Sequence, residues 1–303
     1  MLYVALTVLL ALGLAWYLWD YIKKQQHRTA LPPPPKTVIE FWVYAEDPKL
    51  PSQEAIVEAI RGTPEIAKRF GPEEGLVFSD IRFSLGTVPR EKNPYLFQQD
   101  TVLERDAVLP DDFANRAERA AAIHTIRFVA EEPKYDDREA AALRLCAFCA
   151  VAIAALARGT LVVDIEAQSA WTPQEFERLV RQDPMGLDWN TAVREVTEEG
   201  DVVYLTRGLA KRGMYDLVTP QIAPDQRTVT KSLLEQVVEA AWQNPETQGP
   251  RVRTVKLEKI YDMNFMCLWY VGEPSRERHR SPWINCRFLR LGADDELDMD
   301  AEA

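Results

Sequence analysis

Residues 201–220 combine glycines and basic side chains, and they read DVVYLTRGLAKRGMYDLVTP. The spacing of Gly208 and Gly213 matches the first part of a phosphate-binding loop, G-x-x-x-x-G-K-[ST]. The residues that follow are Met214 and Tyr215 instead of Lys and Ser or Thr, so the pattern does not predict a phosphate site. The two glycines are more typical of turns whose backbone has positive φ.

Three cations surround these glycines: Arg207, Lys211 and Arg212. One interpretation is that they are solvated around a structural turn. The other is that, with the neighbouring Tyr215, they form a surface that binds an acidic partner, because charges at the rim of an interface steer association. We take these four residues as candidate partner-binding residues.

The pair Cys146 and Cys149 has the C-x-x-C spacing of redox motifs and zinc sites. It lies inside a long apolar run, with no second cysteine pair or histidine nearby, whereas a redox thiol normally sits at a helix N-terminus. Free cysteine is among the most buried residue types. We therefore predict that both thiols are core residues.

Catalytic groups do not assemble into a recognisable motif. The three histidines, His27, His124 and His279, have no metal-ligand spacing, and there is no G-x-S-x-G sequence. Asp164 and Glu166 alternate on a predicted strand and could act as acid and base, but charge at a sheet edge is the simpler interpretation. The sequence predicts no catalytic residue, no metal and no cofactor.

The overall charge argues against nucleic acid as a partner. The chain has a formal net charge of −11 and a pI near 5.0, so its field would not attract DNA, RNA or an anionic bilayer.

The N-terminal segment LYVALTVLLALGLAWYLW is uncharged and nearly long enough to cross a hydrocarbon core of about 30 Å. The alternatives are a cleaved signal peptide and a buried core helix. Nothing basic precedes the segment and bulky aromatics end it, which disfavours the signal peptide. We predict a transmembrane anchor over residues 1–22, inserted through residues 2–22. Cations follow it, so the positive-inside rule places the soluble domain in the cytoplasm.

A spacer follows the anchor over residues 23–36. It contains Pro32 to Pro35, which favour an extended polyproline segment. A ligand for a proline-binding domain is the alternative to a stalk. At the other end, residues 293–303 are acidic and poor in apolar residues, which predicts a disordered tail.

Between these segments the chain alternates predicted strands and helices. Strands are predicted at 37–45, 76–86, 101–109, 123–132, 160–167, 192–208 (as a hairpin), 214–222, 252–272 and 281–291, and helices at 52–62, 110–121, 136–159, 172–182 and 225–243. Hairpins with helices on one face predict an α+β fold of antiparallel and mixed sheets, with two ferredoxin-like halves at 37–185 and 186–292.

Two segments resemble blocks of uncharacterised bacterial α+β families: ALARGTLVVDIEAQSAWTPQEF and VVYLTRGLAKRGMYDL. The anchor, proline stalk and cytoplasmic domain together resemble membrane-tethered accessory proteins of type VI secretion loci, such as immunity proteins or adaptors. The resemblance implies a single-pass protein of the bacterial inner membrane that binds another protein, such as a secreted toxin or effector, and it carries no active site.

Two hypotheses of function follow from the sequence. The first is a tethered protein-binding module that is not an enzyme. The second is a membrane-anchored hydrolase or transferase whose site is assembled from residues far apart in the chain.

Overall fold

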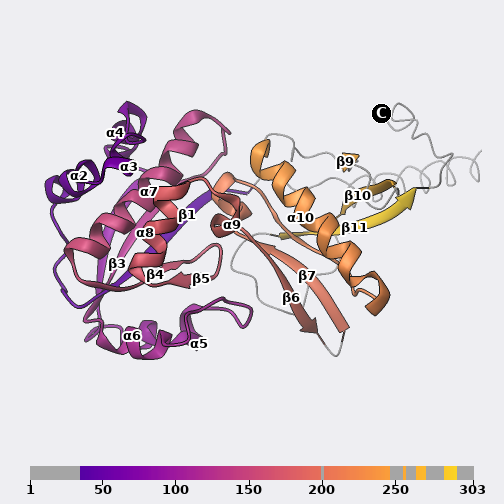
Figure 1. Ribbon diagram of the computed structural model, residues 1–303, viewed down its shortest axis with the longest axis horizontal. Coiled ribbons are helices and arrows are strands. Elements are labelled where there is room, and N and C mark those ends of the chain that lie inside the picture. The colour runs from indigo at the N-terminus through magenta and orange to yellow at the C-terminus, as the bar shows by residue number, and fades with distance from the viewer. Residues whose placement is uncertain (1–34, 199–200, 246–254, 257–263, 271–282, 292–303) are drawn as a thin grey trace, which may run out of the picture.

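The structure is a computed structural model, and it describes residues 35–198, 201–245, 255–256, 264–270 and 283–291 (Figure 1). The predicted anchor (1–22), the predicted tail (293–303) and residues 23–34 of the predicted stalk lie outside the described residues. The α+β class with antiparallel and mixed sheets is confirmed.

The first half contains a five-stranded sheet in the order β2-β3-β1-β4-β5. Its strands are β1 (Thr37–Ala45), β2 (Phe83–Pro89), β3 (Ala122–Ala130), β4 (Gly159–Asp164) and β5 (Ser169–Trp171). All neighbouring strands are antiparallel. Helices connect β1 to β2 and β3 to β4, so each connection steps over a central strand, as in a split β-α-β arrangement.

Helices cover both faces of this sheet, so the prediction of helices on one face is wrong for the first half. Those on one side include α2 (Gln53–Gly62), α7 (Asp137–Leu156) and α8 (Pro173–Gln182), and those on the other include α5 (Gln99–Val102) and α6 (Phe113–Arg119). The cause is visible in β1, where Phe41 packs in the first cluster and Tyr44 in the second. Alternate residues of one strand therefore feed two apolar cores.

Helix α7 is the central helix of the first core. It begins after Asp136, whose side chain accepts a hydrogen bond from the backbone N–H of Glu139. Because the helix is apolar around its whole circumference, it is buried on nearly all sides. Among the described residues it is also the one helix long and apolar enough to cross a membrane, and most of that apolar stretch is buried in the protein.

Helix α7 ends earlier than the predicted range 136–159. The helix ends at Leu156, and Arg158 takes the left-handed conformation with φ of 52°. Gly159 instead begins β4, where an added Cβ would lie 2.9 Å from Ala154. Close approach of the strand to the helix requires this glycine.

Two predicted strands of the first half are helical in part. Residues 76–78 belong to α4 (Pro72–Phe78), because Pro72 and Glu74 form a helix start around Gly71. Residues 101–109 contain the end of α5 and then an irregular segment in which Val108 forms one isolated bridge with Ser169. The remaining short helices of this half are α3 (Pro64–Ala67) and η1 (Pro94–Phe97).

The second half contains a six-stranded sheet in the order β6-β7-β8-β11-β10-β9. Its strands are β6 (Ala192–Glu198), β7 (Asp201–Arg207), β8 (Asp216–Val218), β9 (Val255–Lys256), β10 (Asn264–Tyr270) and β11 (Trp283–Leu291). The predicted hairpin is confirmed as the antiparallel pair β6 and β7. The strand predicted at 252–272 is two strands, since β9 pairs antiparallel with β10.

This second half is not a ferredoxin-like unit in its described residues. A single long helix, α10 (Arg227–Gln243), separates β8 from the last three strands, and β8 pairs in parallel with β11. The short helices here are α9 (Leu187–Asn190), η2 (Leu209–Arg212) and η3 (Pro224–Gln226). One apolar cluster contains buried residues from α7, η2 and α10, so the two halves share a core.

Candidate functional site

The glycine-rich basic segment within residues 201–220 connects β7 to β8 through η2. Gly208 has φ of 92° and Gly213 has φ of 65°, which confirms the prediction of positive φ at both glycines. A Cβ at Gly208 would lie 2.1 Å from the carbonyl oxygen of Asn190, and one at Gly213 would lie 2.4 Å from Pro133. Both positions therefore exclude side chains for reasons of space as well as backbone conformation.

The expectation that the cations of this stretch are solvated or displayed to a partner is wrong for Lys211. Its side chain is fully buried, and its Nζ donates to the carboxylate of Asp164 and, at 3.0 Å, to Oδ1 of Asn190. The ammonium also lies 5.6 Å from the ring centroids of Phe41 and Trp189. Burial lowers the pKa of Lys211, and the charge of Asp164 opposes this shift.

Arg207 is buried in the same way, with only 1% of its surface exposed. Its Nε donates to Oδ2 of Asp106 at 3.0 Å and its Nη2 to Oδ1 of the same carboxylate at 2.8 Å. Nη2 also donates to Glu104. A two-pronged contact of this kind holds a carboxylate in a defined orientation.

We call these three ion pairs the buried clamp: Arg207 and Lys211 from the second half, with Glu104, Asp106 and Asp164 from the first. Each cation of the second half is neutralised by a carboxylate of the first. Removing either Lys211 or Asp164 would leave the charge of the other buried without its partner. Through Arg207 and Lys211, the stretch 201–220 therefore binds the first half of its own chain.

Asp216, at the start of β8, is a further buried carboxylate beside the clamp. Its Oδ1 accepts hydrogen bonds from Oγ1 of Thr206 at 3.0 Å and from the backbone N–H of Leu209 at 3.2 Å. Its Oδ2 has no hydrogen-bond partner among the described residues. Burial raises the pKa of Asp216 to about 7, although Arg207 opposes the shift.

The other two predicted partner-binding residues are half-buried. The guanidinium of Arg212 lies 5.6 Å from the ring centroid of Trp242, in a cation–π contact that holds it against α10. Burial raises the pKa of Tyr215. The structure thus brings Arg207 and Lys211 into the clamp, whereas Arg212 packs against α10 and Tyr215 is not one of the clamp residues.

The remaining candidates for chemistry are also engaged inside the fold. Cys146 and Cys149 are free, fully buried thiols in α7, as predicted, and burial raises the pKa of both. His124 is buried between Oγ1 of Thr87 and the carbonyl oxygen of Asp47. Asp164 and Glu166 are buried, so the interpretation of their charges as exposed at a sheet edge is wrong. His27 and His279 lie outside the described residues.

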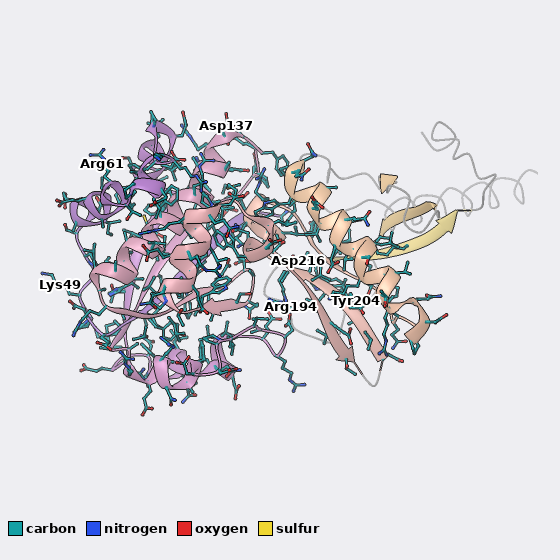
Figure 2. The ribbon with its side chains drawn as sticks, in the orientation of Figure 1. Lys49, Arg61, Asp137, Arg194, Tyr204 and Asp216 are labelled. Atoms are coloured by element: carbon teal, nitrogen blue, oxygen red, sulfur yellow. The ribbon has the colours of Figure 1, made fainter. Side chains whose placement is uncertain are left out.

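A groove of about 660 Å³ opens where the two halves meet, next to the clamp. One wall comes from β5 and Val108, another from α9 and the first three residues of β6, and a third from the exposed side of α10. Figure 2 shows Arg194 and Asp216 close to this junction of the halves. Sequence reasoning missed the groove because its walls are separated by long stretches of chain.

Arg194 ties two walls of the groove together. Its Nη2 donates to Oγ of Ser169 at 3.0 Å, and its Nε is buried without a hydrogen-bond partner in the described structure. Burial lowers the pKa of Arg194, and Asp106 opposes this shift. The contact joins β6 to β5, so it holds these two walls of the groove together.

The groove combines apolar contact area with exposed acidic groups. Trp171 and Leu187 are half-buried in its walls, and Asp188, Glu235 and Glu239 are exposed around it. Apolar side chains next to polar and charged groups are common in surfaces that bind another molecule. No family model, curated protein or solved structure matches this chain.

Proposed function

We propose that this protein is a membrane-tethered protein-binding module, of the immunity or adaptor type found at type VI secretion loci, and that its partner docks in the groove between the two halves. The observation that carries the proposal is the groove itself, an open concave surface built on two sheets. The tether and the secretion-locus association rest on the N-terminal apolar segment and on the resemblance described above.

The buried clamp supports this proposal because it makes the groove rigid. Arg207 and Lys211 hold the second half against Asp106 and Asp164 of the first, at sites closed to solvent. A groove whose walls are already in place loses little conformational entropy when a partner binds. Less of the binding free energy is then used to order the groove, and more of it contributes to affinity.

The rival hypothesis of an anchored hydrolase or transferase finds less support in the geometry. Lys211 and Asp164, the pair best suited to proton transfer, are fully buried and face each other. The hydroxyl of Ser169 lines the groove, but it donates to the carbonyl oxygen of Ala167 at 3.2 Å and accepts from Arg194. A nucleophile would need a base in place of that carbonyl.

Site-specific photo-crosslinking in the cells that make the protein tests the proposal. A photoreactive residue at Glu239, in the groove, is expected to capture a partner protein, whereas one at the exposed Lys49 on the opposite side of the first half is not (Figure 2). The captured protein, once purified, should bind the full chain directly, and Glu239→Lys should weaken that binding. Equal capture at both positions would overturn the proposal.

The orientation of the tether has its own test. A reporter active only in the periplasm, fused after Ala303, is expected to be silent, and a cytoplasmic reporter at the same place is expected to work. The opposite result would reverse the proposed orientation while leaving the groove as the binding site.

A further inference from the structure

Strand β6 is an edge strand that borders the groove. It is the first strand in the order of its sheet, and β7 is the strand with which it pairs in the described structure. In an antiparallel pair, alternate residues direct their N–H and C=O groups away from the neighbouring strand. The outer side of β6 therefore presents a row of backbone donors and acceptors.

Two sheet edges flank the groove, and they differ in whether another segment of the chain covers them. At β5 the backbone is already occupied, because the N–H of Val108 donates to the carbonyl of Gln168 and the N–H of Ala170 donates to the carbonyl of Val108. No such segment covers β6 in the part of the chain that the structure describes. The strand has no proline, and its pairing with β7 has no register shift. Two common protections of a sheet edge are thus missing here.

The charge around this edge is acidic. Asp188, Glu235 and Glu239 are exposed in the lining of the groove. Glu235 is paired with Lys231 at 3.9 Å, but both side chains are about half exposed (53% and 51%), so the pair is weak. The cation of the lining, Arg194, is directed to Ser169. The groove therefore favours a ligand that carries lysine or arginine.

We propose that the groove binds an extended, basic segment of the partner protein, which adds to the edge of β6 as an extra strand. This inference rests on the proposed function and specifies its mode of recognition. Backbone hydrogen bonds to β6 supply affinity that does not depend on side chains, as in other cases of strand addition. The acidic groups then select basic side chains of the bound segment. Trp171 and Leu187 provide apolar contacts for the residues of that segment that lie between its basic residues.

Selection of peptides from a random nonapeptide display library on the purified full chain in detergent tests this inference. We expect the enriched peptides to carry alternating lysine or arginine and β-branched residues, and to lack proline. Each selected peptide is then synthesised with N-methyl groups on alternate residues, in two versions that differ by one residue in register. One version should lose about tenfold or more in affinity, as expected for loss of a backbone hydrogen bond, and the other should not.

Variants of the protein test the acidic groups separately. The double variant Glu235→Lys and Glu239→Lys is expected to weaken binding of the selected peptides, while Glu118→Lys on the exposed side of α6 is the matched control. Failure to enrich any peptide, or enrichment of acidic peptides, would overturn the inference. If both N-methylated versions bind like the parent peptide and the double variant still weakens them, strand addition is wrong but the groove remains a protein-binding site.

Discussion

Lys211 and Asp164 form an ion pair whose two side chains are both fully buried. The lysine lies in η2 of the second half and the aspartate at the end of β4 in the first, 47 residues apart in the sequence. Oδ1 of Asp164 also accepts from the backbone N–H groups of Glu166 and Ala167, at 3.1 and 2.9 Å. The pair therefore fixes both the junction of the halves and the turn after β4.

Replacing one residue of this pair should lower the stability of the fold. We expect Lys211→Met to lower the free energy of unfolding by about 3–5 kcal/mol, because Asp164 is then left buried without its cation. Adding Asp164→Asn should recover much of this loss, since the amide oxygen can still accept the two backbone hydrogen bonds. Urea unfolding of the two single variants and the double variant measures the coupling, and additive effects would contradict it.

The two glycines around η2 should not tolerate side chains. We expect Gly208→Val and Gly213→Val each to lower the free energy of unfolding by more than about 2 kcal/mol, because both have positive φ and both contact other atoms at the position of a Cβ. Gly62→Ala is the control, since nothing lies within 4 Å of its added Cβ. Its stability should be unchanged or up to about 1 kcal/mol higher.

Asp216 should make stability depend on pH. Burial raises its pKa from 3.8 to about 7, so between these values the folded protein holds a proton that the unfolded chain has released. The stabilisation is complete below the unfolded pKa and is lost as pH rises through the folded one, by at most about 1.4 kcal/mol per pH unit. We expect the wild type to lose stability relative to Asp216→Asn as pH rises from 4 to 7.

Denaturant unfolding of both proteins at several pH values measures this difference, in which contributions from groups distant from Asp216 largely cancel. Parallel curves for the wild type and the variant would show that Asp216 is already ionised at pH 4 in the folded protein.

The thiols of α7 should behave as packing groups. We expect Cys146→Ala with Cys149→Ala to lower the free energy of unfolding by about 1–3 kcal/mol through lost contacts, without changing binding to the proposed partner. In the native protein both thiols should resist alkylation and react only after denaturation, because they are fully buried. Stoichiometric zinc that is lost on this replacement would refute the packing role.

Local signals in the sequence predicted many of the elements. The helix predicted at 172–182 is α8, which starts at Pro173 with a capping box between the Thr172 hydroxyl and the Glu175 carboxylate. The helix predicted from residue 136 is α7, and Asp136 is its N-cap. These signals act within one turn of a helix, so neighbouring residues suffice to read them.

Other elements depended on distant contacts. Residues 76–78 and 101–109 contain apolar and β-branched residues typical of strands, yet Val77 and Val102 pack as parts of helices against the two faces of the first sheet. Propensity is a weak guide where tertiary packing decides which face a residue covers.

The sequence by itself determined the α+β class, most of the helix starts, the β6–β7 hairpin and the positive φ of Gly208 and Gly213, because these follow from local sterics and periodicity. Only the tertiary structure decided that Arg207 and Lys211 are buried, since the carboxylates that neutralise them lie 101 and 47 residues away. The groove is likewise a product of tertiary structure. Its walls come from segments that meet only when the two halves of the chain pack against each other, and packing of this kind leaves no pattern in any one of them.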